Sequence, residues 1–180
     1  VNEKLSNMNQ ITPEMMQNMQ QDAYSHKAAD FISMLKNLEI GSGLTPSEND
    51  FYAKLTKWNF QYKANDSAPT LFDLFYKKLA ANTWDELTKL KEIMDINDPE
   101  DWRLLEMITS DPDNKYFDIK DTPEKENAKD IVLKSLKDAS KAVEERQKDG
   151  KGITWGEYKP LHIYHLTRIP AFSEMDIPAN

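Results

Sequence analysis

The sequence predicts a mainly α-helical protein, a multi-helix assembly that ends in one C-terminal extended or strand segment. Apolar residues recur at spacings of three and four over most of the chain, which is the period of a helix with one buried face. Pro followed closely by acidic residues marks several helix starts. From residue 151 the chain becomes rich in aromatic residues around a Pro, which favours extended structure. We therefore divide the chain into a helical region, 1–150, and an extended segment, 151–180.

The first two helices have the clearest start signals. The first is predicted to begin with Thr12 as N-cap and Pro13 at the first helical position, and to end near Gly41. Its apolar stripe is Tyr24, Ala28, Phe31, Leu35 and Leu38. The second is predicted to begin at a capping box, because Glu48 lies three residues after the cap residue Thr45. Its buried face is predicted to be Phe51, Leu55 and Trp58.

Four more helical patterns follow. The apolar stripes of the first three are Leu71, Phe72, Phe75 and Leu79; Leu87, Leu90 and Met94; and Trp102, Leu105 and Ile108, after a cap at 98–101. Residues 110–121 are predicted to form a loop that Tyr116 and Phe117 anchor. The last and longest helix is predicted to begin at Thr122 and to end at Gly150. Its buried face is predicted to be Val132, Leu136, Ala139 and Val143.

Composition and charge exclude several classes of function. The 180 residues suit one domain, and four Trp, seven Tyr and seven Phe supply large side chains for a core. The net charge of -8 repels phosphate backbones, so we expect no binding to nucleic acid. No apolar run approaches the length of a transmembrane helix, so we expect no membrane span. The absence of Cys excludes disulfides and thiol chemistry.

No residue pattern indicates a catalytic, cofactor-binding or metal-binding residue. His162 and His165 lie three apart, but such positions of a strand point to opposite faces, so we expect two structural histidines. His26 stands alone and is expected to be an ordinary surface or core residue. Asp111 and Asp113 lack the Gly and the distal Glu of a calcium loop, so turn chemistry is expected there. The chain has neither a Gly-x-Ser-x-Gly elbow nor a Gly-rich phosphate loop.

The two ends of the chain are unusual. Residues 155–166 have strand character, yet no partner strand is predicted within the chain, so we expect this segment to pair with something outside it. The chain also opens at Val1 without a Met, and we interpret it as a piece of something larger. Near this end, Met15, Met16 and Met19 form a cluster that we interpret as core packing in preference to a binding groove.

Several short motifs occur in a fixed order along the chain. They are Ile11-Thr12-Pro13-Glu14-Met15-Met16 with Gln20-Gln21-Asp22-Ala23-Tyr24-Ser25; Leu55-Thr56-Lys57-Trp58-Asn59; Ser67-Ala68-Pro69-Thr70-Leu71-Phe72; and Trp155-Gly156, then His165 and Ile169-Pro170-Ala171-Phe172-Ser173. Their order and spacing resemble the β-chain of the penicillin acylase (penicillin amidase) family, which belongs to the N-terminal nucleophile hydrolase superfamily. The sequence departs from the family pattern at Asn59, where Asp is usual, and at Lys159, where many members have His.

The resemblance implies an enzyme that hydrolyses the linear amide C–N bond of a small N-acyl substrate. Family members are precursors cut into α- and β-chains with an αββα sandwich core, and the new N-terminal residue of the β-chain is the nucleophile. Val1 does not match that nucleophile. The resemblance places the oxyanion Asn just before Val1 and a Gly-rich strand just after Asn180, so no catalytic residue is carried over to this chain.

Two functions are therefore expected from different classes. The first is a helical segment of a penicillin-acylase-like amidohydrolase, inactive alone. Its partners would be the remainder of the β-chain and the α-chain, and the resemblance implies a periplasmic or extracellular location. The alternative is a free-standing acidic helical protein-interaction module, whose C-terminal strand docks on the sheet edge of a partner.

Overall fold

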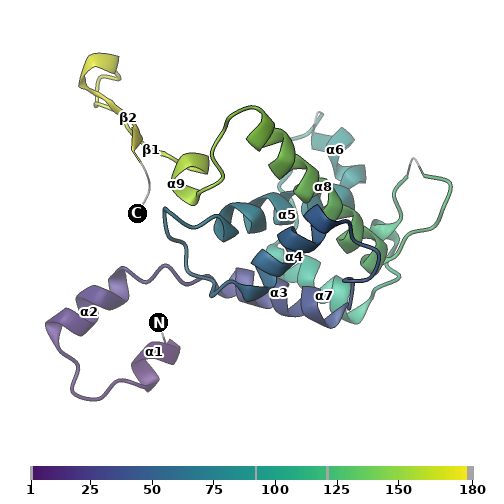
Figure 1. Ribbon diagram of the computed structural model, residues 1–180, viewed down its shortest axis with the longest axis horizontal. Coiled ribbons are helices and arrows are strands. Elements are labelled where there is room, and N and C mark those ends of the chain that lie inside the picture. Colours follow the sequence, from purple (N-terminus) through teal and green to yellow (C-terminus); the bar gives the residue numbers. More distant parts are fainter. Residues whose placement is uncertain (1, 92, 121, 178–180) are drawn as a thin grey trace.

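The computed structural model describes residues 2–91, 93–120 and 122–177, and it confirms the mainly α-helical class (Figure 1). The longer helices gather around one core, and a two-stranded ribbon follows near the C-terminal end. The helices are α1 (Asn2–Ser6), α2 (Pro13–Gln20), α3 (His26–Asn37), α4 (Pro46–Lys57), α5 (Ala68–Thr83), α6 (Asp85–Lys91), α7 (Asp101–Ser110), α8 (Ala128–Lys148) and α9 (Trp155–Tyr158). The strands are β1 (Leu161–Ile163) and β2 (Glu174–Ile177), and 3-10 turns cover Lys115–Phe117 and Pro170–Phe172.

The core lies mainly between α5 and α8, with α3, α4 and α7 packed around this pair. Phe75 and Leu79 on α5, and Leu136 on α8, are completely buried. The predicted stripes of both helices are confirmed, because each of their positions belongs to the buried core. Phe51, Leu55 and Trp58 are also buried as predicted. This apolar burial is the main term that stabilises the helical region.

The first predicted helix is in fact two helices with a break between them. The N-cap at Thr12 is confirmed, since its hydroxyl accepts a hydrogen bond from the backbone N–H of Met15. However, α2 ends at Gln20, and Ser25 caps a new helix by accepting from the N–H of Ala28. Polar side chains that bond to nearby backbone groups compete with continued helix, which explains the break. The stripe from Ala28 to Leu35 is buried as predicted, whereas Tyr24 lies in the break and is exposed.

The N-cap of the longest helix lies five residues later than predicted, at Asn127 instead of Thr122. Thr122 does not cap it, because the helix begins only at Ala128. The Thr122 hydroxyl instead lies 2.8 Å from the carbonyl oxygen of Ile119 and 2.7 Å from the carboxylate of Glu126, either of which can accept its single proton. Asn127 caps it instead, in a capping box with Asp130. The capping box predicted at Thr45 and Glu48 is confirmed at the start of α4.

We expect Asn127→Ala to lower the free energy of unfolding by about 1 kcal/mol, the usual cost of a lost N-cap. The Asn127 carboxamide oxygen accepts from the N–H groups of Lys129 and Asp130, at 2.9 and 3.2 Å, and both donors would lose this partner. Urea unfolding followed by circular dichroism measures the change. Thr122→Ala is the matched control and should shift stability by less than about 0.5 kcal/mol. Equal losses in the two variants would mean that the helix does not depend on this cap.

Two predicted faces are corrected. On α7 the buried residues are Leu104, Met107 and Ile108, whereas the side chain of Trp102 is 65% exposed. The helix is therefore turned relative to the predicted stripe, and Leu105 lies at the edge of the buried face. The stripe predicted for α6 fails for a different reason. This helix ends at Lys91, so Met94 lies beyond it, and Leu90 and Met94 are both exposed.

The C-terminal segment also differs from the prediction. Trp155–Tyr158 is a short helix, α9, because Thr154 and Glu157 form a capping box at its start. Strand structure begins only at Leu161, and β1 pairs with β2 as an antiparallel ribbon in which Leu161 faces Ile177. The partner strand thus lies within the chain, contrary to the expectation. Within the described residues the ribbon has only these two strands, so each has one edge without a neighbouring strand.

Candidate interaction surface

His26, the pair His162 and His165, and the acidic loop with Asp111 and Asp113 lie in three different segments of the chain. His162 lies on β1, and His165 follows it with its Nδ1 2.9 Å from the hydroxyl of Thr167. His26 is the first residue of α3 and contacts the ring edge of Tyr24. Asn114 donates to Asp111 at 2.6 Å and caps the turn at residues 115–117. Across the described parts of the chain, no three or more His, Asp and Glu side chains gather to hold a metal ion.

Two segments of the chain carry apolar side chains that lie outside its buried core. The first, which we call the C-terminal arm, is residues 159–177 and contains the β1–β2 ribbon. Six apolar residues of this arm are each at least 43% exposed: Leu161, Ile163, Tyr164, Leu166, Ile169 and Phe172. A two-stranded ribbon is marginally stable alone in water. Exposed apolar side chains concentrated in one short segment make this arm a candidate interaction site.

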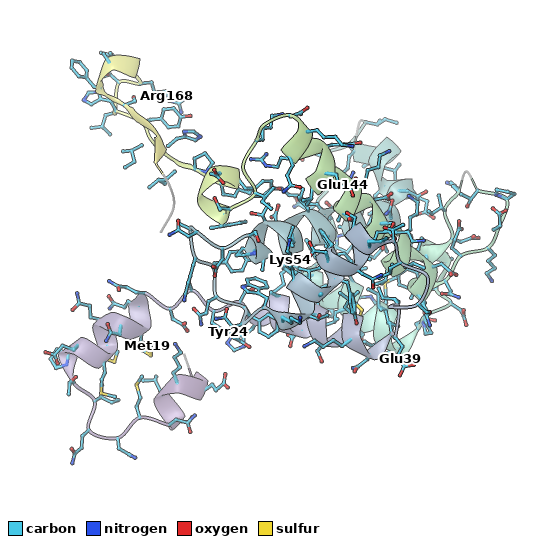
Figure 2. All side chains as sticks on the ribbon, viewed as in Figure 1. Met19, Tyr24, Glu39, Lys54, Glu144 and Arg168 are labelled. Carbon is cyan, nitrogen blue, oxygen red and sulfur yellow. The ribbon has the colours of Figure 1, made fainter. Side chains whose placement is uncertain are left out.

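The second segment, which we call the N-terminal arm, is residues 2–22 and contains α1 and α2. None of the described side chains on these two helices is buried. The apolar ones are Leu5, Met15, Met16 and Met19, with Met8 and Ile11 between the helices. The prediction that Met15, Met16 and Met19 pack in the core is wrong, because none of the three belongs to the buried core of this chain. Figure 2 shows Met19 on this arm and Arg168 on the C-terminal arm, both away from the helical core.

Backbone hydrogen bonds attach the C-terminal arm to the helical region through α9. The N–H of Trp155 donates to the carbonyl oxygen of Asp66, and the N–H of Gly156 donates to that of Ala64, both at 2.9 Å. The indole of Trp155 also meets the ring of Tyr62 edge-on, with the ring centroids 4.8 Å apart. The arm therefore projects from a fixed base, and only residues from Lys159 onward leave the core.

A polar network on α5 holds the other side of α9. The Tyr158 hydroxyl donates to Asp73 at 2.6 Å and accepts from Lys77 at 3.1 Å, while Lys77 pairs with Asp73 at 2.7 Å. Burial, together with the hydrogen bond to Asp73, raises the pKa of Tyr158. The guanidinium of Arg146 lies 5.1 Å from the centre of the Tyr158 ring. Arg146 also donates to the carbonyl oxygen of Gly152, which fixes the turn before α9.

An ion pair links α1, at the start of the N-terminal arm, to Asp22 at the end of the arm. Lys4 of α1 lies 2.7 Å from the carboxylate of Asp22, and the hydrogen bond from Lys4 lowers the pKa of Asp22. A hollow of about 490 Å³ lies between α1 and the segment that joins the arm to α3, and Tyr24, His26 and Gln61 form part of its lining. This pair joins two ends of the arm that are far apart in sequence, and thus folds α1 back toward residue 22.

We expect the stability of the chain to fall steeply above pH 10, in part because of Tyr62. Burial, and next the charge of Asp73, raise the pKa of Tyr62 to about 12, whereas an unfolded Tyr titrates near about 10. The neutral phenol is therefore favoured in the folded chain. Its contribution is complete below pH 10 and is lost as the pH rises toward 12. Urea unfolding at pH 8 and pH 11 should show a smaller difference for Tyr62→Phe than for wild type. The same difference in both proteins would contradict the assignment.

The fold and these two arms define a class: an acidic, mainly α-helical unit with exposed apolar side chains on two arms outside its core. The family model for penicillin amidase matches residues 1–180. The chain belongs to the penicillin amidase family, whose members are acylase-type amidohydrolases. No curated protein and no solved structure matches the sequence. None of the helices in the described ranges is long and apolar enough to cross a membrane.

Proposed function

We propose that this chain is a helical part of a penicillin-acylase-like amidohydrolase, and that the nucleophile lies in another part of the enzyme. The observation that carries the proposal is the apolar surface of the two arms in a chain of this family. A helical unit that hydrolysed amides alone would need a nucleophile, a base and oxyanion donors in one place. The residues singled out in the sequence do not meet in such an arrangement. The isolated chain is therefore proposed to be inactive.

The partners of the arms are proposed to be the remainder of the β-chain and the α-chain. The free edges of β1 and β2 suit pairing with a strand of the partner's sheet, which supplies backbone hydrogen bonds. Burial of the six apolar side chains of the C-terminal arm contributes on the order of 10 kcal/mol before the entropic cost of association. In this arrangement the extended segment 151–180 leads from the helical region 1–150 into the central sheet, with α9 as its base.

The reaction proposed for the assembled enzyme is hydrolysis of the amide bond of a small N-acyl substrate. The hydroxyl of the N-terminal residue attacks the carbonyl carbon of the substrate, and the α-amino group of the same residue takes the hydroxyl proton. An acyl-enzyme forms as the amine leaves. Water then releases the acid and restores the nucleophile. The helices of this chain are proposed to help wall the acyl-binding cleft. The location proposed for the enzyme is periplasmic or extracellular, in keeping with the same resemblance.

Sequencing the gene on both sides of this segment tests the proposal. The expected result is an upstream Ser, Thr or Cys after a junction of small residues, and a Gly-rich strand downstream of Asn180. A start codon directly before Val1 and a stop codon directly after Asn180 would overturn it. That second result would favour the alternative, an acidic helical protein-interaction module.

A further inference from the structure

We call the loop that follows α4 the bridging loop (residues 58–66). The root of the N-terminal arm, residues 23–25, is fixed to this loop by backbone hydrogen bonds. The N–H of Ser25 donates to the carbonyl oxygen of Phe60, and the N–H of Tyr62 donates to that of Ala23, both at 3.0 Å. The residues between these bonds form an isolated antiparallel bridge. The arm is thus attached by a short ladder of paired backbone groups, in which each bond restricts the orientation of the next residues.

The C-terminal half of the same loop holds the base of the C-terminal arm. The carbonyl oxygens of Ala64 and Asp66 are the acceptors for the two N–H groups at the start of α9. The roots of the two arms are about 130 residues apart in the chain, from Ser25 to Trp155. Within the bridging loop their attachment points are separated by only a few residues. One short segment therefore carries both arms.

An uninterrupted series of aromatic contacts also joins the two roots through the bridging loop. The distances between ring centroids, taken in order, are 6.0 Å for Tyr24–Phe60, 5.6 Å for Phe60–Trp58, 5.3 Å for Trp58–Tyr62, 4.8 Å for Tyr62–Trp155 and 6.0 Å for Trp155–Tyr158. All lie in the range in which aromatic pairs attract one another. The indole of Trp58 also donates to the carbonyl oxygen of Gln61 at 3.1 Å, which fixes the ring at the middle of the series.

The bridging loop holds one strained residue at the junction with the N-terminal arm. Phe60 has a φ of 63°, in the left-handed region that large side chains rarely adopt. Such a conformation persists when the surrounding contacts impose it. Here the imposing contacts are the hydrogen bond from Ser25 to its carbonyl oxygen and the rings of Tyr24 and Trp58 on either side. The shape of the loop is thus set by the contacts that carry the arm.

We propose that the bridging loop fixes the two arms relative to each other, so that they form one two-part interaction surface for a single partner. Both arms lie on the same side of the helical core, on the left in Figure 1, with the N-terminal arm in purple and the C-terminal arm in yellow. Once one arm has bound, the other is held near its own site at a high effective concentration. The identity of the partner, the remainder of the acylase polypeptide, rests on the proposed function.

A distance measurement between the arms tests the fixed geometry. The chain has no Cys, so Gln17→Cys and Thr167→Cys place one spin label on each arm without further changes. The expected result is a narrow distribution of label-to-label distances, at least twofold broader when Tyr62→Ser or Phe60→Gly is added. Phe60→Gly suits the left-handed φ, so it removes the ring contacts without straining the backbone.

Tyr116→Ser is the matched control, because Tyr116 is a half-buried Tyr that contacts Trp84 outside the bridging loop. It should leave the width of the distribution unchanged. A broad distribution in the parent, no broadening by Tyr62→Ser and Phe60→Gly, or equal broadening by Tyr116→Ser would each overturn the inference.

Binding to the separately produced remainder of the enzyme distinguishes this inference from the proposed function. The wild-type chain is expected to bind, and Phe60→Gly is expected to bind at least tenfold more weakly while it keeps its helical circular dichroism. Equal affinity of the two proteins would contradict the inference and leave the proposed function standing. Failure of the wild-type chain to bind would contradict the proposed function, whereas the distance measurement needs no partner and would still decide the geometry.

Discussion

Replacing Leu166 and Phe172 together by Asp is expected to weaken assembly with the remainder of the enzyme at least about 100-fold, since each side chain contributes about 1.5–3 kcal/mol when buried. Both side chains project from the C-terminal arm, and they are 99% and 67% exposed in the chain alone. Asp at these positions would also leave unpaired carboxylates in an apolar contact, which adds a desolvation cost. Titration of the labelled chain with the remaining polypeptide, followed by fluorescence anisotropy, measures the loss.

The same double variant should leave the stability of the chain itself unchanged to within about 0.5 kcal/mol, because both side chains are mostly exposed and belong to no part of the buried core. Trp102→Asp is the matched control, since Trp102 on α7 is 65% exposed, close to the value for Phe172. An acid in the first turn of a helix is also tolerated well. Assembly should be normal in this control. An equal loss of affinity in Trp102→Asp would show that exposed apolar area in general, and not the arm, drives association.

Phe75→Ala is expected to lower the free energy of unfolding by about 3–5 kcal/mol, the usual cost of removing a buried Phe ring. The ring is completely buried on α5, and α5 packs against α8, where Leu136 and Ala139 are also fully buried. The cavity left behind adds to the lost transfer free energy, because a close-packed interior relaxes only in part. For a domain whose total stability is typically about 5–15 kcal/mol, this is a large fraction.

Urea unfolding at neutral pH measures the loss, and Phe172→Ala provides the comparison with an exposed ring. The comparison variant should change stability by less than about 0.5 kcal/mol. A loss below about 1 kcal/mol for Phe75→Ala would mean that α5 and α8 do not form the stabilising centre of the chain.

The parts of the fold that the sequence predicts well carry strong local signals. The start of α4 is set by a capping box between Thr45 and Glu48, four residues that specify their own structure. The buried faces of α5 and α8 repeat over 16 and 21 residues, so their period is clear in the sequence. In such segments local preference and tertiary packing agree, and the expected helix is the observed one.

The misplaced elements are those for which two local readings compete. Thr122 and Asn127 both precede acidic residues, but the Asn127 side chain accepts from helix N–H groups, whereas the Thr122 hydroxyl contacts Ile119 and Glu126. Trp102 fits one apolar stripe of α7, yet Leu104, Met107 and Ile108 form another, and the packing of α7 against α3 and α8 decides which is buried. Trp155–Tyr158 has strand-like composition, but its capping box makes it helical. Tertiary contacts decide these cases, so pattern alone cannot.

The candidate surface could be predicted from the sequence only in part. The strand character near residue 161 predicted extended structure in the C-terminal segment, but the sequence pattern did not predict that β2 pairs with β1. The bridging loop could not be predicted at all. Its contacts are backbone hydrogen bonds and ring pairs between segments far apart in sequence, such as Tyr62 with Ala23 and with Trp155. The spacing of residues along a chain does not predict contacts of this kind.

Hydrolysis of a chromogenic N-acyl anilide, measured for the purified chain and for the polypeptide expressed from the whole gene, tests most directly where the nucleophile lies. We expect turnover by the whole polypeptide and none by the chain alone, because the nucleophile is proposed to lie outside residues 1–180. Turnover by the purified chain, in proportion to an active site that can be titrated, would show that the chain carries its own nucleophile.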